Sequence, residues 1–522
     1  MEVKKIEVTE WTLPKLLINI EGGVLRIPKF QREFVWSRPQ TIKLLDSIYK
    51  EYPIGSLFFW YPSDIYKNMY REIPELQQQK ASRSAGIQLI LDGQQRITSI
   101  YAVSKGLTIN GTDYSRIVFD LEKKVFAARS PDNDRFISFQ NIVDDNEKYY
   151  EISDGLPHEK RKILQKCSSR FKNYPFSIVE VYEKSLEEVC DIFERINQGG
   201  KRLTLFDLLV AATWSDEFDL RTKVKEYNEK SEQKGFGVIN PDVFIQALAL
   251  IIKGQCTRKI QLELTTKDLI ENWDNLIASL DLAIDYLIKN MGVYKFDMIP
   301  YPGLLVMFTY LFAKIKGRSL SNSQSEESER WFWNTTLSER YGASSLTNMT
   351  EDRKKINKIT EDQQISSKLP VNVSVESLMQ IKMGQTSAIK NAVLCLLALK
   401  KPLHFENAVV INVDDRYFSD YWSTEKHHIF PKKFLAKKGI NLSDVNYWPN
   451  FCFIPSELNK KILDSEPKKY FSMYRENKEF KKIMRSHLIP IDEQSGIWTN
   501  DYRKFLTQRA ELILKELKKL YQ

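Results

Sequence analysis

Apolar residues recur at helical spacing in several parts of the chain. The segment 38–52 is amphipathic, follows Ser37, a residue type that often caps helices, and carries Pro39 in its first turn. Longer stretches of the same periodicity predict further helices at 241–253, 273–288, 300–315, 389–399 and 502–522. We therefore expect the region 211–405 to be mostly helical.

Short apolar runs at 87–91 and 116–121 have the length and composition of buried strands, and they alternate with helices in the first part of the chain. The polar segment 319–330 reads as a loop. After about residue 406 the segments become shorter and richer in aromatic residues. The pattern predicts an α+β multidomain protein with an α/β domain at 1–210, a helical connector at 211–405 and a third domain at 406–522.

Length and composition support several folded domains. The chain has 522 residues with 42% hydrophobic and 12% aromatic side chains, which is typical of globular proteins. Its formal net charge of +9 permits an anionic partner without requiring one. The five cysteines are scattered and form no CxxC pair, so we expect reduced thiols and a cytoplasmic protein. The most apolar run, 303–313, is shorter than the roughly twenty residues that cross a bilayer, so no membrane association is expected.

The sequence LDGQQRITSI (91–100) combines a strand, a tight turn at Asp92-Gly93 and the start of a helix. Arg96 falls in the first turn of that helix, where a cation opposes the helix dipole. This placement makes sense if Arg96 helps to hold an anion at the helix N-terminus. The alternative is an ordinary turn with Arg96 in a surface salt bridge. The chain has no GxxxxGK[ST] sequence, which excludes an ordinary P-loop.

Two further segments accompany this turn. Gln31 and Arg32 lie in IPKFQREFVW, and FERINQGGKRLTLFDLL predicts a helix that ends at Gly199-Gly200 and another that begins at Thr204, with Asp207 in capping-box position. The three segments, in this order, resemble the ParB-like domain with the DGQQR motif of GmrSD-type modification-dependent restriction enzymes. The resemblance covers roughly residues 10–215. It implies binding and hydrolysis of a nucleoside triphosphate and a part in sensing modified DNA. The nucleotide-binding residues that it implies are Gln31, Arg32, Asp92, Gly93, Gln94, Gln95, Arg96 and Asn197.

The sequence EKHHIFPKKF (425–434) places two of the five histidines side by side, at His427 and His428. On a strand, adjacent side chains point to opposite faces, so the two could hardly share one task. A surface pair without a role is the alternative. Asn450 and Asn459 follow, with NFCFI (450–454) expected as a strand and PSELNKKI (455–462) as the start of a helix.

This order of His-His, hairpin, Asn, helix and Asn resembles the HNH endonuclease superfamily, whose fold is the ββα-metal fold. The resemblance implies that His428 is the general base and that Asn450 braces the loop that holds it. It implies that His427 and Asn459 bind a metal ion, for which we expect Mg²⁺ or Mn²⁺. Many HNH enzymes have an acidic residue at the position of His427 and a histidine at that of Asn459. Lys460 and Lys461 are candidate phosphate contacts, although surface lysines are more often simply solvated.

Together these resemblances predict a phage-defence DNA endonuclease, with a ParB-like sensor domain, a helical connector and an HNH domain that nicks or cuts modified or foreign DNA. One alternative is a ParB-like DNA-binding regulator with a non-catalytic HNH fold, and another is a nuclease that acts on RNA. The sequence leaves open which modification is sensed, which nucleotide is bound, whether that nucleotide stimulates or restrains cleavage, and whether the chain forms a homo-oligomer.

Overall fold

The structure is a computed structural model that describes residues 6–28, 31, 34–62, 70–71, 86–144, 147–182, 184, 188–189, 192, 195, 204–215, 217–365, 369–382, 387–411 and 428–522. The chain is α+β and divides into two compact units, Met1–Asp216 and Glu217–Gln522. The division falls close to the predicted boundary at 210. The predicted connector and the predicted C-terminal domain both lie within the second unit.

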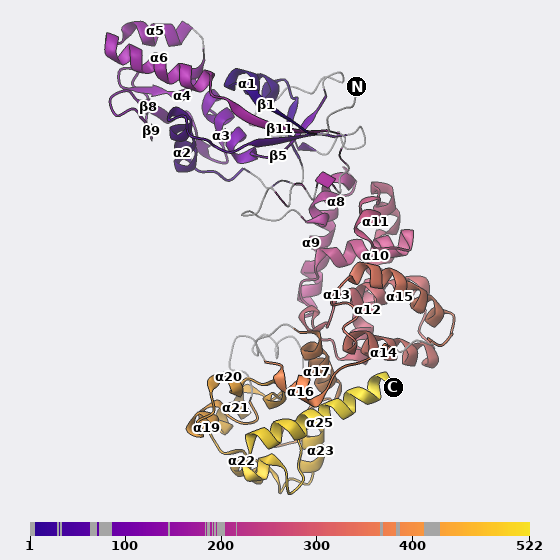
Figure 1. Ribbon diagram of the computed structural model, residues 1–522. Coiled ribbons are helices and arrows are strands. Elements are labelled where there is room, and N and C mark those ends of the chain that lie inside the picture. Colours follow the sequence, from indigo (N-terminus) through magenta and orange to yellow (C-terminus); the bar gives the residue numbers. More distant parts are fainter. Residues whose placement is uncertain are drawn as a thin grey trace. The chain divides into compact units, whose positions relative to one another are not determined.

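A six-stranded mixed sheet forms the centre of the first unit (Figure 1). Its strands lie in the order β1-β11-β3-β5-β2-β4, where β11 pairs in parallel with β3, β5 pairs in parallel with β2, and the other neighbours are antiparallel. The strands are β1 (Ile6–Trp11), β2 (Leu25–Pro28), β3 (Leu57–Tyr61), β4 (Tyr70–Arg71), β5 (Gln88–Asp92) and β11 (Phe176–Tyr182). The strand predicted at 87–91 is thus β5, in the interior of the sheet.

Helices and smaller sheets complete this unit. The strand predicted at 116–121 is β8 (Ile117–Asp120), which pairs with β9 (Val125–Ala128) and β10 (Phe136–Ser138); β6 (Thr108–Ile109) and β7 (Thr112–Asp113) form a short hairpin. The helices are α1 (Leu13–Glu21), α2 (Arg38–Tyr49), α3 (Gln94–Lys105), α4 (Phe139–Val143), α5 (Glu147–Gly155), α6 (His158–Lys172) and α8 (Leu205–Thr213). The predicted capping box of α8 is present, with Asp207 N donating to Thr204 Oγ1 at 3.1 Å.

One apolar core joins the large sheet to its helices. It includes Phe59 and Ile90 from the sheet and Ile97, Ile100 and Tyr101 from α3, each at most 3% exposed. Burying an apolar side chain of this size contributes about 1.5–3 kcal/mol. The predicted buried face of α3 is therefore confirmed, and its packing fixes the position of the turn between β5 and α3.

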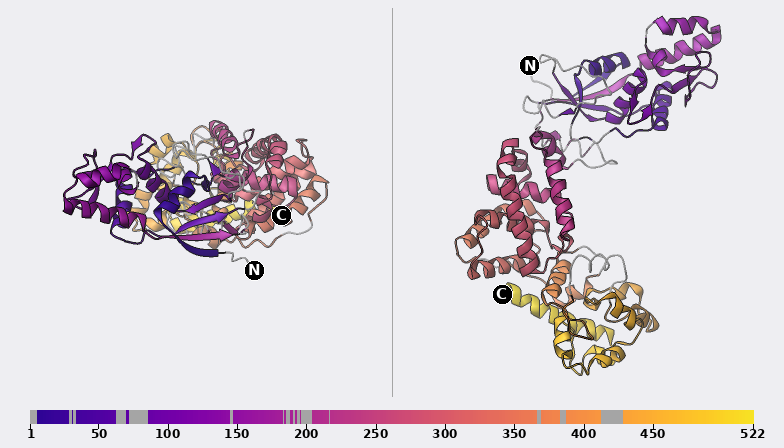
Figure 2. Two further views of the ribbon diagram at one scale, coloured as in Figure 1. Left: turned by 90° about the horizontal axis from the view of Figure 1, so that it is seen from above. Right: turned by 180° about the vertical axis from the view of Figure 1, so that it is seen from behind.

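The second unit is helical (Figures 1 and 2). Its first part contains α9 (Leu220–Gln233), α10 (Pro241–Lys253), α11 (Arg258–Leu262), α12 (Thr266–Met291), η3 (Phe296–Met298), α13 (Pro302–Lys314), α14 (Asn322–Leu337), α15 (Ser345–Thr360), α16 (Val375–Gln380) and α17 (Ala388–Leu399). The most apolar run of the sequence is α13, which is buried from Gly303 to Phe312. Among the described helices, none is both long and apolar enough to cross a membrane.

The loop predicted at 319–330 is wrong, because α14 begins within it. Ser321 caps the helix: its Oγ accepts from Gln324 N at 3.1 Å, and its own N donates to Gln324 Oε1 at 3.0 Å. Glu327 is buried although it is charged, since Arg330 pairs with it at 2.7 Å and the Ile365 N–H donates to it at 3.0 Å. Polar residues that pair within the protein thus form a helix that a hydrophobic pattern does not reveal.

The last part of the second unit consists of short helices around a core that includes Phe430, Tyr470 and Phe505. They are α19 (Lys432–Lys437), α20 (Leu442–Val445), η4 (Trp448–Asn450), α21 (Ser456–Ile462), α22 (Pro467–Tyr474), α23 (Phe480–Ser486), α24 (Gly496–Thr499) and α25 (Tyr502–Tyr521). The helices predicted at 455–462 and 502–522 are confirmed as α21 and α25. The helix α25 also contacts α14, α16 and α17, which joins this part to the rest of the unit.

The strand predicted at 450–454 is wrong. Phe451 forms only an isolated antiparallel bridge with His428, and no regular strand occurs within the described residues 428–522. Two short helices and the turn η4 occupy the interval between His428 and Phe451 in place of a hairpin. Pro449 contributes to this difference because it lacks the N–H that a strand pairing requires.

Candidate functional site

The turn between β5 and α3 requires glycine. Gly93 has φ +92°, in the left-handed region, and a Cβ placed on it would lie 2.3 Å from Leu57 Cδ2. Asp92, the last residue of β5, therefore leads directly into the first turn of α3. The predicted strand, turn and helix of the DGQQR segment are present as expected.

Arg96 ties this turn to the segment before β3. Its Nη1 donates to Ile54 O at 2.6 Å, and its Nη2 donates to Ser56 O at 3.1 Å and to Asp92 Oδ2 at 2.7 Å. The Arg96 side chain is 16% exposed, so these bonds are largely shielded from water. The contacts are those of the salt-bridged alternative that the sequence left open. Contact of Arg96 with a phosphate stays a prediction.

The glutamines of the motif region also contact the backbone. Gln31 Nε2 donates to Leu91 O at 2.8 Å and also to Ile90 O, so Gln31 lies against the end of β5. Val35 N donates to Gln95 Oε1 at 2.9 Å. Gln94 and Gln95 are both buried, at 5% and 9% exposure. Gln31, Asp92 and Arg96 thus meet at the carboxyl end of β5, whereas Arg32 and Asn197 lie outside the described residues.

His428 and Asn450 are adjacent in the second unit. Asn450 is fully buried and holds both sides of one peptide: Phe430 N donates to its Oδ1 at 2.7 Å, and its Nδ2 donates to Phe430 O at 3.1 Å. The backbone pairs as well, because Ile429 N donates to Asn450 O at 2.8 Å. These bonds fix the path of the chain that follows His428, as the predicted bracing position of Asn450 requires.

The His428 ring contacts a residue that the sequence analysis missed. His428 is 6% exposed, and its Nε2 lies 3.0 Å from Asn446 Oδ1. Asn446 follows α20 and belongs to none of the segments that carry the HNH resemblance. No pattern in the sequence singles it out, because the contact depends on how the chain returns from α20 to η4.

A buried arginine supports the same region. Arg509 is 0% exposed, and its guanidinium donates to four carbonyls: Pro449 O at 2.7 Å, His487 O at 2.9 Å, Leu488 O at 3.3 Å and Phe451 O. Burial lowers the pKa of Arg509 to about 10. The sequence does hold a signal for Arg509, because helical spacing places it on the apolar face of α25 together with Phe505 and Ile513.

The other predicted residues of this region lie on and near α21. Asn459 is half-buried, and its side-chain amide makes no hydrogen bond to any residue that the structure describes. Lys460 is exposed, whereas Lys461 Nζ donates to the Glu406 carboxylate at 2.8 Å and 3.1 Å, which raises the pKa of Lys461. His427 lies outside the described residues. Within the described ranges no three His, Cys, Asp or Glu side chains gather as a metal site.

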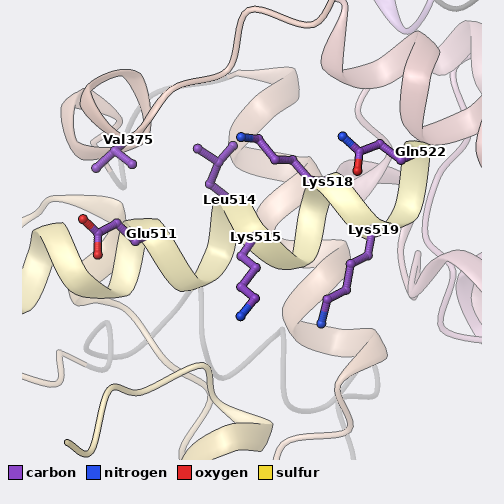
Figure 3. A pocket seen from close by; sticks show the side chains of 7 residues that line it. All are labelled: Val375, Glu511, Leu514, Lys515, Lys518, Lys519 and Gln522. Carbon is purple, nitrogen blue, oxygen red and sulfur yellow. The ribbon is translucent and has the colours of Figure 1, made fainter.

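A hollow of about 390 Å³ lies near the end of α25 (Figure 3). Figure 3 shows Lys515 and Lys519 extending to one side of the helix and Lys518 to the other, so the three ammonium groups do not converge. Lys519 is also paired with Glu516 at 2.5 Å. None of the predicted site residues lines this hollow, whose lining residues are Val375, Glu511, Leu514, Lys515, Lys518, Lys519 and Gln522.

Comparison with known proteins assigns the first unit. Residues 13–214 match the family model described as the N-terminal domain of GmrSD restriction endonuclease. The chain is also 26% identical to Uncharacterized protein MJ0686 of Methanocaldococcus jannaschii, over 95% of this chain and 96% of that protein. The matched range contains the turn at 92–96 together with Gln31. Through residues 13–214 the chain belongs to the GmrSD-type restriction endonuclease family.

Proposed function

We propose that this protein is a DNA endonuclease of phage defence. In this proposal the ParB-like first unit binds and hydrolyses a nucleoside triphosphate and senses modified or foreign DNA. The second unit contains an HNH domain that hydrolyses phosphodiester bonds with Mg²⁺ or Mn²⁺. The match of residues 13–214 to a restriction endonuclease domain supports the DNA substrate.

The observation that carries the nuclease proposal is the fixed pairing of His428 with Asn450. A general base must hold one orientation relative to the water that it activates. The bonds of Asn450 to the Phe430 peptide, at 2.7 Å and 3.1 Å, hold the backbone next to His428 in a single path. A neutral imidazole can accept a proton near neutral pH. We assign His428 as the group that takes the proton from water.

The proposed metal ligands are His427 and Asn459. A bound divalent cation would stabilise negative charge on the phosphoryl and leaving oxygens. The amide of Asn459 fits this use, because an oxygen ligand suits Mg²⁺ or Mn²⁺ and the side chain is not bonded to any residue in the described ranges. Lys460, which is exposed, is the better placed of the two lysines for a phosphate, since Lys461 is paired with Glu406.

The proposed nucleotide site is the start of α3. The first turn of an α-helix has N–H groups without helical partners, and these bind phosphate. Since Arg96 is bonded to Asp92 and to two carbonyls, we infer that it shapes the turn. Arg32, Gln94, Gln95 and Asn197 remain the candidates for direct nucleotide contacts.

The test is cleavage of plasmid and phage DNA, unmodified and with defined modifications, with Mg²⁺ or Mn²⁺ and with each nucleoside triphosphate in turn. We expect His428→Ala to lower the rate by about 10²-fold or more, the usual contribution of a general base. His158→Ala is the control, because His158 is exposed at the start of α6. Cleavage by His428→Ala at the parent rate would remove His428 from the mechanism. Absence of cleavage on every DNA would favour the DNA-binding regulator.

A further inference from the structure

We propose that Asn446 is a positioning residue that fixes the tautomer and orientation of the His428 ring. This inference rests on the proposed function, in which His428 is the general base. Its basis is the contact of 3.0 Å between His428 Nε2 and Asn446 Oδ1, two residues that are 18 positions apart.

The chemistry of this contact assigns the proton of the ring. An amide oxygen only accepts hydrogen bonds, so Nε2 must carry the hydrogen that it donates to Asn446. A neutral imidazole carries one such hydrogen, which leaves the lone pair on Nδ1. Nδ1 is then the nitrogen that can take a proton from water. Without the Asn446 oxygen both tautomers are accessible, and part of the protein holds a hydrogen where the base needs a lone pair.

Asn446 is itself held in place by the residues that hold the His428 loop. The preceding residue, Val445, accepts at its carbonyl from Asn450 Nδ2 at 3.1 Å and from Tyr502 Oη at 3.2 Å. Tyr502 Oη also donates to Asp444 O at 2.8 Å. Asn450 therefore fixes the backbone on both sides of the contact, next to His428 through Phe430 and next to Asn446 through Val445. A rigid support of this kind is what orientation of a catalytic ring requires.

A purely structural role for Asn446 would be to satisfy a buried imidazole N–H. Two substitutions of similar size separate the roles. Asn446→Asp keeps an oxygen acceptor at the same reach, whereas Asn446→Leu keeps the volume and removes the acceptor. A loss caused by altered packing would affect both variants, but a loss of the acceptor would affect only the leucine variant.

The experiment uses the full chain with its histidines labelled with ¹⁵N. Imidazole ¹⁵N shifts report the tautomer, and the His428 signal is the one missing from His428→Ala. We expect the parent and Asn446→Asp to hold the hydrogen on Nε2 and Asn446→Leu to populate both tautomers. In DNA cleavage, we expect Asn446→Leu to lower kcat by about 10²-fold with little change in KM, and Asn446→Asp to retain most of the rate.

Each outcome decides the proposal. It fails if Asn446→Leu keeps the Nε2–H tautomer and the parent kcat, or if the aspartate and leucine variants lose activity alike. If the parent cleaves no DNA, the proposed function fails, but the ¹⁵N shifts still show whether Asn446 sets the tautomer. Equal melting temperatures of the two variants would show that neither result comes from unfolding.

Discussion

Arg96 and Arg509 each join backbone segments that are far apart in the sequence. Arg96 bonds the carbonyls of Ile54 and Ser56, and Arg509 bonds four carbonyls on both sides of the His428 region. A guanidinium suits this use because its five N–H donors lie in one plane. The residue types and the DGQQR turn were predictable from the sequence. Their partners were not, because a partner distant in the sequence is set by the tertiary fold.

His487 provides a test of burial at the scale of one residue. It is 1% exposed, and its Nε2 lies 2.8 Å from Leu403 O. Burial lowers the pKa of His487 from 6.5 to about 3, and the nearby positive charge of Arg509 acts in the same direction. As the pH falls from 6.5 towards 3, the unfolded chain binds a proton that the folded chain does not. The free energy of unfolding should therefore fall over this range, by up to about 1.4 kcal/mol per pH unit from this residue.

Replacement of His487 by glutamine keeps an amide N–H for Leu403 O and removes the titration. We expect His487→Gln to lose less stability than the parent between pH 6.5 and pH 4, as measured by urea unfolding at a series of pH values. His158→Gln is the control, because His158 is exposed and its replacement should leave the pH dependence unchanged. Parallel pH profiles for His487→Gln and the parent would contradict the assignment of a neutral buried imidazole.

At the scale of elements, hydrophobic periodicity was a good guide where a helix or strand has an apolar face. It predicted α2, α3, α10, α13, α17, α25, β5 and β8. It failed for α14, whose first turns are polar and are held by capping and by the pairing of Glu327 with Arg330. It failed again at 450–454, where an apolar run is buried by surrounding helices without pairing as a strand. Burial from all sides and strand pairing give the same apolar pattern in a short segment.

The start of α14 gives a prediction at this scale. Ser321 accepts from Gln324 N at 3.1 Å, and its hydroxyl donates to Asp362 Oδ1 at 2.8 Å. Ser321→Ala removes both bonds, so we expect the free energy of unfolding to fall by about 1–2 kcal/mol. The measurement is the urea midpoint of the second unit. Ser319→Ala is the matched control, because Ser319 is exposed and precedes the helix, and an equal loss in both variants would exclude the cap as the cause.

At the scale of the whole molecule, the division at residue 216 separates the two proposed ligand sites. The turn at 92–96 belongs to the first unit, and His428, Asn450 and Asn459 belong to the second. A ligand that binds only the folded form of one unit stabilises that unit, by about 2.7 kcal/mol at a concentration one hundred times its Kd. The two ligands should therefore act on different unfolding transitions.

Calorimetry of the full chain tests this division. We expect two transitions, of which the one lowered by Ser321→Ala belongs to the second unit. Nucleoside triphosphate should raise the other transition, and Mn²⁺ should raise the one that Ser321→Ala lowers. A nucleotide effect on the Ser321-sensitive transition would place the nucleotide site in the second unit, contrary to the proposal. A single transition in the parent would show that the two units unfold together, so that binding at one site would be felt energetically at the other.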